Sequence, residues 1–139
     1  MNISRRHVMA AGLGSAMLPV TAAFAQTNPP SMARIYIGFP AGGTTDAVSR
    51  HIANKLQPGY ARSVIVESKP GASGQIAVQV TKTSSNDGTA ILMTPMSILG
   101  VFPHTYKRVP YDPMKDVIPV SRGVSYNYGF AVGPSVPAS

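Results

Sequence analysis

Three short apolar runs alternate with two helix-like stretches over residues 33–94, and the links between them are short. The runs read ARIYIGF, SVIVES and TAILMT, and they are rich in the β-branched and aromatic residues of buried strands. In the first helix-like stretch Val48, Ile52 and Leu56 recur at every fourth position, and a Pro-Gly pair ends it. A β-α-β-α-β order with short links favours a parallel sheet with helices on its faces. The sequence therefore predicts an α/β fold.

Two glycine-rich turns follow the first two runs: GFPAGGTTD, Gly38 to Asp46, and KPGASGQ, Lys69 to Gln75. In parallel sheets the loops at the carboxyl ends of strands line the ligand crevice, and residues 94–97 meet the same condition. Bare glycines let a ligand approach backbone N–H groups, and a helix start favours an anion. We expect the two turns to hold one carboxylate between them, with tight strand-helix packing as the alternative. Thr44 or Thr45 is the expected helix N-cap.

The N-terminus has the pattern of a cleavable export signal. Two arginines precede an apolar stretch, and Ala23-Phe24-Ala25 forms an A-x-A cleavage site. A membrane-spanning helix needs about 20 apolar residues, whereas two glycines and a proline interrupt this one. We therefore expect a signal peptide over residues 1–25 and a flexible lead over residues 26–32. The arginine pair fits twin-arginine export, and Sec export remains open.

Composition removes several classes of function. The net charge is +7, but the basic residues are scattered without a basic tract, so no nucleic-acid partner is expected. The absence of cysteine excludes a disulfide framework, a thiolate metal site and a cysteine nucleophile. The three histidines lack metal-ligand spacing. No metal and no cofactor are expected.

Two catalytic motifs are matched only in part. The first turn has the spacing of a phosphate-binding loop, but Thr44 replaces the lysine that such loops need, which argues against a nucleotide in an exported protein. Ser73 lies in G-A-S-G-Q, where a nucleophile elbow would have glycine in place of Gln75. No general base can be assigned to Ser73, so no enzyme is expected, and an exported serine hydrolase is the alternative. For Asp46, helix capping and ligand contact are both open.

Four segments together resemble the periplasmic solute receptors of tripartite tricarboxylate transporters, the Bug-type receptors: IGFPAGGTTDAVSRHIANKL, VIVESKPGASGQIAV, DGTAILMTP and YKRVPYDPMKDVIPVS. The resemblance implies a two-domain, periplasmic-binding-protein-like fold that closes on a small carboxylate and delivers it to a membrane permease, and we expect a monomer. It also implies that VPYDP is structural, with Tyr111 packed between prolines. The ligand-binding residues that it implies are Phe39, Gly42, Gly43, Asp46, Ser73, Gly74 and Thr94.

A complete receptor of this kind continues into a second domain and returns to finish the first. On that resemblance the chain is expected to be an N-terminal fragment without the second domain and the return segment. Residues 33–132 would form the N-terminal part of domain 1, with one more strand over residues 128–132. Residues 133–139 would start the interdomain crossover. A truncated remnant without function is a further alternative, and the sequence does not specify the carboxylate.

Overall fold

The computed structural model describes residues 28–127, 129 and 131–133. The expected signal peptide over residues 1–25 lies outside the described residues. The expected lead reaches into them, and there it is one residue too long, because Met32 already belongs to the first strand. In the described part of the chain, no helix has both the length and the apolar character needed to cross a membrane.

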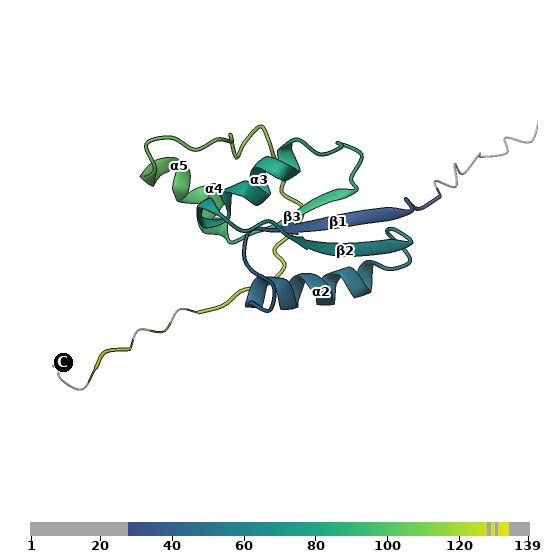
Figure 1. Ribbon diagram of the computed structural model, residues 1–139, viewed down its shortest axis with the longest axis horizontal. Coiled ribbons are helices and arrows are strands. Elements are labelled where there is room, and N and C mark those ends of the chain that lie inside the picture. The colour runs from purple at the N-terminus through teal and green to yellow at the C-terminus, as the bar shows by residue number, and fades with distance from the viewer. Residues whose placement is uncertain (1–27, 128, 130, 134–139) are drawn as a thin grey trace, which may run out of the picture.

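A three-stranded parallel sheet forms the centre of the domain (Figure 1). Its strands are β1 (Met32–Ile37), β2 (Ser63–Ser68) and β3 (Ala90–Met93), in the order β2-β1-β3. Ile37, the last residue of β1, pairs with Ser68 on one side and with Met93 on the other. The α/β class, the parallel sheet and the β-α-β-α-β order are confirmed, as for part of a periplasmic-binding-protein-like domain. All three strands therefore end at the same edge.

Helices cover both faces of this sheet (Figure 1). The helix α2 (Thr44–Leu56) lies along one face, whereas α3 (Gln75–Lys82), α4 (Met96–Gly100) and α5 (Phe102–Thr105) lie on the other. A short 3-10 turn, η1 (Ala72–Gly74), leads into α3. The prolines after Leu99 predict no long helix, and α4 and α5 have only five and four residues.

One hydrophobic core lies between the sheet and α2. Alternate residues of β1, namely Ala33, Ile35 and Ile37, point into it and are almost fully buried. Ile52, Ala53 and Leu56 of α2 pack against them. Two of the three apolar positions predicted for this helix are thus core contacts, because residues four apart share one helix face.

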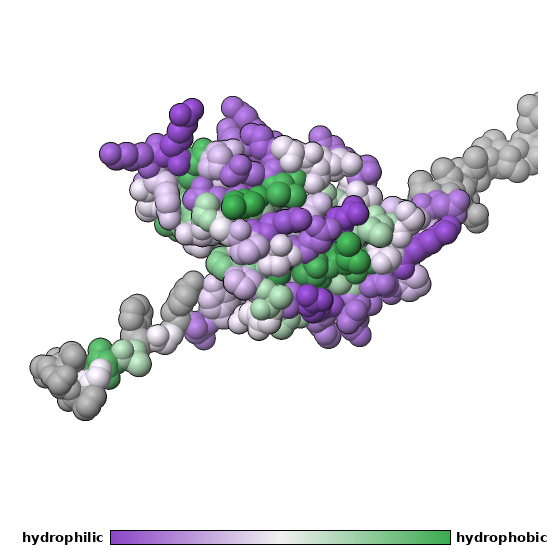
Figure 2. Space-filling view, viewed as in Figure 1, coloured by the Kyte–Doolittle hydropathy of each residue, from purple (hydrophilic) through white to green (hydrophobic). Residues whose placement is uncertain are grey.

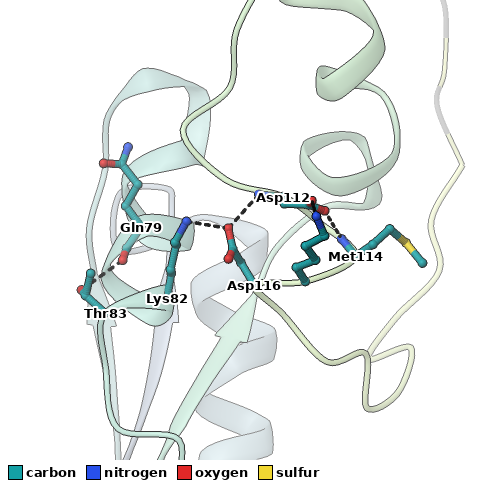
Figure 3. A network of polar contacts seen from close by, with 7 residues as sticks. Gln79, Lys82, Thr83, Asp112, Met114 and Asp116 are labelled. Atoms are coloured by element: carbon teal, nitrogen blue, oxygen red, sulfur yellow. Dashed lines mark hydrogen bonds and ion pairs between the residues drawn. The ribbon is translucent and has the colours of Figure 1, made fainter.

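A second core lies on the opposite face and joins Val78 of α3, Ile98 of α4 and Tyr111. The hydroxyl of Tyr111 donates a hydrogen bond to the carbonyl oxygen of Ile98. Tyr111 is 5% exposed and packs in this core with Val78 and Ile98, as expected for a structural residue, whereas its expected packing between prolines stays a prediction. Lys82 and Asp116 face each other across this region (Figure 3), with Nζ and Oδ2 2.8 Å apart. This ion pair ties α3 to the segment after α5.

Beyond Val117 the chain leaves the second core. Ile118 and Val120 are 88% and 93% exposed. The chain then returns to the sheet at Gly123, where an added Cβ would lie 2.6 Å from Met93 Cε and 3.6 Å from Ile52 Cδ1. Apolar side chains also reach the surface over the edge strand β2 (Figure 2).

The additional strand expected over residues 128–132 is not formed at Gly129, Ala131 and Val132. Tyr128 and Phe130 lie outside the described residues. None of the three strands of the described sheet pairs with these residues. An apolar run needs such a partner to become a strand.

Candidate functional site

The first two glycine turns touch each other at the carboxyl edge of the sheet. Gly38 follows β1, and a Cβ built on it would lie 2.5 Å from Gly74 Cα and 2.8 Å from Gly74 O in the second turn. Those distances leave no room for a side chain, so glycine permits a direct backbone contact there. Thr94 follows β3, whose last residue pairs with Ile37. The three loops expected at this edge therefore lie beside one another.

Gly74 and Phe39 form a packed wall in this region. Gly74 has φ +94°, and an added Cβ would lie 2.5 Å from Ile98 Cδ1 and 3.5 Å from two ring atoms of Phe39. The Gly74 amide donates to the carbonyl oxygen of Gly71 at 2.9 Å. This amide is thus already used within the turn. For Gly74, tight packing explains the glycine better than contact with an anion does.

Asp46 closes the first turn from within. Its Oδ2 accepts hydrogen bonds from the Gly42 amide at 2.9 Å and from Arg50 Nε at 3.0 Å. The hydrogen bond from Arg50 and then that from Gly42 lower the pKa of the Asp46 carboxyl, which is only 5% exposed. Asp46 therefore stays ionised and holds the loop against the start of α2. The geometry favours the capping interpretation of Asp46 over direct ligand contact.

The predicted N-cap is wrong. Gly43 is the N-cap of α2, with no side-chain cap bond, and both Thr44 and Thr45 lie inside the helix. Asp46 supplies the carboxylate instead, because it reaches back four residues to the Gly42 amide. A carboxylate in the first helical turn also suits the helix dipole, as expected.

The open donors of the first turn are the amides at the helix start. The amides of Gly43, Thr44 and Thr45 have no hydrogen-bond partner among the described residues, as is usual for the first turn of a helix. Gly42 has φ +87°, and nothing lies within 4 Å of a Cβ built on it. The exposed backbone at Gly42 and Gly43 thus borders open space. An anion here would meet amides one to three residues beyond the occupied Gly42 amide.

Ser73 is exposed and has φ +56°, a conformation uncommon for residues other than glycine. No histidine or carboxylate of the described residues is hydrogen-bonded to its hydroxyl. The two histidines within this part of the chain, His51 and His104, are exposed on α2 and α5. The arrangement thus offers Ser73 no general base.

Three buried side-chain oxygens lack a hydrogen-bond partner among the described residues: Thr94 Oγ1, Asp46 Oδ1 and Ser49 Oγ. Asp46 and Thr94 are predicted site residues, whereas Ser49 is not among them. The sequence offers only one indication that Ser49 is buried, its position four residues before Ala53 on the same helix face. Buried polar atoms are nearly always hydrogen-bonded, so each of these oxygens is a candidate partner for a further polar group.

The described residues were also searched for metal sites and for cavities away from the glycine turns. No three His, Cys, Asp or Glu side chains there are grouped to hold a metal ion. A cavity of about 200 Å³ lies beside the start of β3 and the end of α3, and it contains none of the predicted site residues. Its lining is Arg34, Tyr36, Thr83, Ser84, Ser85, Thr89 and Ala90.

Comparison with known proteins identifies the family of this chain. A family model described as "Tripartite tricarboxylate transporter family receptor" matches residues 48–139. The match includes Ser73, Gly74 and Thr94, but it begins after the first glycine turn.

Several curated proteins are similar to the chain. It is 37% identical over 116 residues to a UPF0065 protein of Bordetella bronchiseptica, covering 84% of this chain and 35% of the relative. It is 32% identical to the UPF0065 protein in the gbd 5' region of Cupriavidus necator, covering 97% and 43%. It is 34% identical to Protein BugT of Bordetella pertussis, covering 70% and 30%. The chain thus spans between 30% and 43% of the length of these relatives. It belongs to the tripartite tricarboxylate transporter receptor family.

Proposed function

We propose that this chain supplies one wall of a periplasmic solute receptor that binds a small carboxylate and delivers it to the permease of a tripartite transporter. The observation that carries the proposal is the backbone contact between the two glycine turns, the first of which leads into the open amides at the start of α2. Membership of the receptor family supports it. The receptor breaks no bond and is not an enzyme.

The amides of Gly43, Thr44 and Thr45 are the proposed carboxylate donors. A helix start attracts an anion by only about 0.3–1 kcal/mol at an exposed site, so several donors have to act together. Ser73 and Thr94 lie in the two neighbouring loops at the same edge of the sheet, and their hydroxyls are further proposed partners of the ligand. Phe39 and Gly74 pack against each other at the contact between the turns, and Asp46 fixes the first turn. Without Arg5 and Arg6 of the proposed signal peptide the net charge is +5, which favours an anionic ligand.

The location and organisation follow the same proposal. Residues 1–25 direct export to the periplasm as a cleavable signal peptide, by the twin-arginine or the Sec route. Residues 33–132 form part of domain 1, residues 133–139 begin the crossover, and the receptor acts as a monomer. A closing second wall would exclude water from the carboxylate and so strengthen its hydrogen bonds.

Thr44→Pro tests the proposed donors, because it removes one amide hydrogen without breaking the helix. Thr44 is the first residue of α2, where proline is well tolerated, and Gly43 before it is extended at φ −78° and ψ 173°. We expect affinity for bound carboxylates to fall roughly tenfold, as for loss of a charge-assisted hydrogen bond. Thr44→Ala is the matched control, since it keeps the amide and removes the side chain.

Isothermal titration with butyrate, succinate and citrate measures these affinities. If the unmodified chain binds none of them, or Thr44→Pro binds as tightly as Thr44→Ala, the proposed site is wrong. An ester panel tests the hydrolase alternative in parallel. Ester turnover that is lost in Ser73→Ala would show that the protein is a serine hydrolase and not a receptor. A chain that neither binds a carboxylate nor turns over an ester is the result expected for a remnant without function.

A further inference from the structure

Asp46 and Ser49 bring two buried oxygens to the same face of α2. Ser49 is 0% exposed, and the side chain of Asp46 is 7% exposed. Neither Asp46 Oδ1 nor Ser49 Oγ has a hydrogen-bond partner among the described residues. Side chains three positions apart are neighbours on a helix, with Cβ atoms about 5–6 Å apart. The two oxygens therefore lie within one helical turn of each other, beside the first glycine turn that Asp46 holds.

The hydroxyl of Ser49 lacks the partner that a hydroxyl within a helix usually has. A helical serine or threonine commonly donates to the carbonyl oxygen four residues earlier. Thr81 donates in this way to the carbonyl oxygen of Ala77 at 2.9 Å. Ser84 donates to that of Val80 at 2.7 Å. Ser49 makes no such bond within the described chain, so its hydroxyl is left to donate to a group other than the backbone of α2.

The Asp46 carboxylate is hydrogen-bonded through only one of its two oxygens. Oδ2 accepts from Arg50 Nε at 3.0 Å and from the Gly42 amide at 2.9 Å. The same two hydrogen bonds lower the pKa of the carboxyl, so it is ionised at neutral pH and Oδ1 shares the negative charge. A buried charged oxygen without a donor is strongly unfavourable. Oδ1 thus requires a donor, whereas the Ser49 hydroxyl requires an acceptor.

A water molecule meets both requirements at once, because it can accept from the hydroxyl and donate to the carboxylate. With hydrogen bonds of about 2.8 Å, one water spans two oxygens up to about 5.6 Å apart, which matches side chains three residues apart. A metal ion fits less well, since a hard cation such as Ca²⁺ takes about six or more oxygen ligands. The described residues offer no group of three His, Cys, Asp or Glu side chains there. Both oxygens are buried, so a larger solute does not reach them.

We propose that one buried water molecule bridges Asp46 Oδ1 and Ser49 Oγ, and that Ser49 is thereby a positioning residue for the first glycine turn. The bridge holds the carboxylate by both oxygens, Oδ1 on the water and Oδ2 on the Gly42 amide. A carboxylate held at both oxygens rotates less readily away from that amide. The turn therefore keeps its shape before any ligand arrives. This inference goes beyond the proposed function and does not depend on it, because no ligand atom takes part.

A high-resolution crystal structure of the unmodified chain tests the bridge directly. We expect one ordered water within hydrogen-bond distance of both oxygens, as is typical of buried water with two to four polar partners. A direct hydrogen bond between Ser49 Oγ and Asp46 Oδ1 would overturn the proposal. A bond from Ser49 Oγ to the carbonyl oxygen of Thr45, with no water at Asp46 Oδ1, would overturn it as well.

Hydrogen exchange of the Gly42 amide in Ser49→Ala tests the positioning role. We expect this amide to exchange roughly three- to tenfold faster than in the unmodified chain, as for the weakening of one hydrogen bond. The Ile35 amide, in the central strand β1, reports opening of the whole domain and should change by less than about twofold. Ser84→Ala is the matched control, because it removes a hydroxyl that is bonded to a backbone carbonyl elsewhere. It is expected to leave exchange at Gly42 unchanged.

The comparison of two amides separates positioning from a general loss of stability. Equal acceleration at Gly42 and Ile35 in Ser49→Ala would show that the substitution only destabilises the domain, and would overturn the positioning role. Unchanged exchange at Gly42 would overturn it too. If Ser49→Ala fails to fold, the crystal structure of the unmodified chain still decides whether the water bridge exists.

Discussion

At the residue scale, glycine at position 74 is required by two independent features. Its φ of +94° is one that residues with a side chain rarely adopt, and a Cβ there would lie 2.5 Å from Ile98 Cδ1. The backbone of Gly74 is also in direct contact with the backbone of Gly38. Position 74 thus joins the first turn, the second turn and the second core.

Gly74→Ala is expected to lower the free energy of unfolding by about 1–3 kcal/mol, because it adds strain in the backbone and overpacks Ile98. Urea unfolding followed by circular dichroism measures the change. Gly59→Ala is the matched control, since no atom lies within 4 Å of a Cβ at that position. Equal effects of the two substitutions would show that the packing at Gly74 is not specific.

The Asp46 carboxyl gives a prediction about pH. Its pKa is lowered from 3.8 in the folded chain by hydrogen bonds from Arg50 and Gly42. Its contribution to stability is therefore fully present above the unfolded-state pKa and is lost as pH falls through the lower folded pKa. We expect the difference in stability between the unmodified chain and Asp46→Asn to shrink as pH is lowered from about 6 to about 2. Urea midpoints across that range test this, and a constant difference would contradict it.

At the scale of elements, α3, α4 and the segment after α5 depend on one another. Val78, Ile98 and Tyr111 come from these three parts and bury one another. Lys82 of α3 also binds Asp116, whose Oδ2 accepts the Asp112 amide hydrogen at 2.7 Å (Figure 3). Helices of five and four residues are too short to be stable alone, so tertiary contacts hold them.

Tyr111→Phe is expected to destabilise the domain by about 1–3 kcal/mol, because it leaves the buried Ile98 carbonyl without its donor. Tyr106→Phe is the control, since Tyr106 is 45% exposed and its ring contact with Phe102 survives the change. Unfolding midpoints of the two variants provide the comparison. A Tyr111→Phe variant as stable as Tyr106→Phe would show that this hydrogen bond contributes nothing net.

At the scale of the whole molecule, the two cores lie on opposite faces of one sheet. In β3, Ile91 and Met93 belong to the core under α2, and Leu92 between them belongs to the other core. Each core thus holds the sheet on which the other packs. A single cooperative unit follows from this arrangement.

We therefore expect the domain to unfold in a single transition. Val64→Ala in the first core and Val78→Ala in the second should each lower the midpoint of that transition. Each should cost about 1–3 kcal/mol, the range for deleting buried methyl groups. Far-ultraviolet circular dichroism and tyrosine fluorescence are the two probes. Val120→Ala, at a position 93% exposed, is the control with little expected effect. Two separate transitions in either core variant would contradict a single unit.

The α/β class, the three strands, the edge at which the glycine turns meet and the family could all be predicted from the sequence. Short apolar runs predict strands, and apolar residues at every fourth position predict helices. Both patterns depend mainly on residues that are close together in the sequence. Strand β2 has the predicted bounds, and β1 and β3 differ from theirs by one or two residues. Such features are read from a chain because they depend on residues close to one another in it.

Which amide donors of the turns are occupied could not be predicted from the sequence, because it depends on tertiary contacts. The Gly42 amide is taken by Asp46, the Gly74 amide by Gly71, and the cap of α2 falls on Gly43 rather than on a threonine. The central position of β1 and the burial of Ser49 are likewise tertiary. The physical reason is that a glycine turn has the same sequence whether its amides face a ligand or the protein's own oxygens. That choice depends on which side chains the fold brings within hydrogen-bond distance.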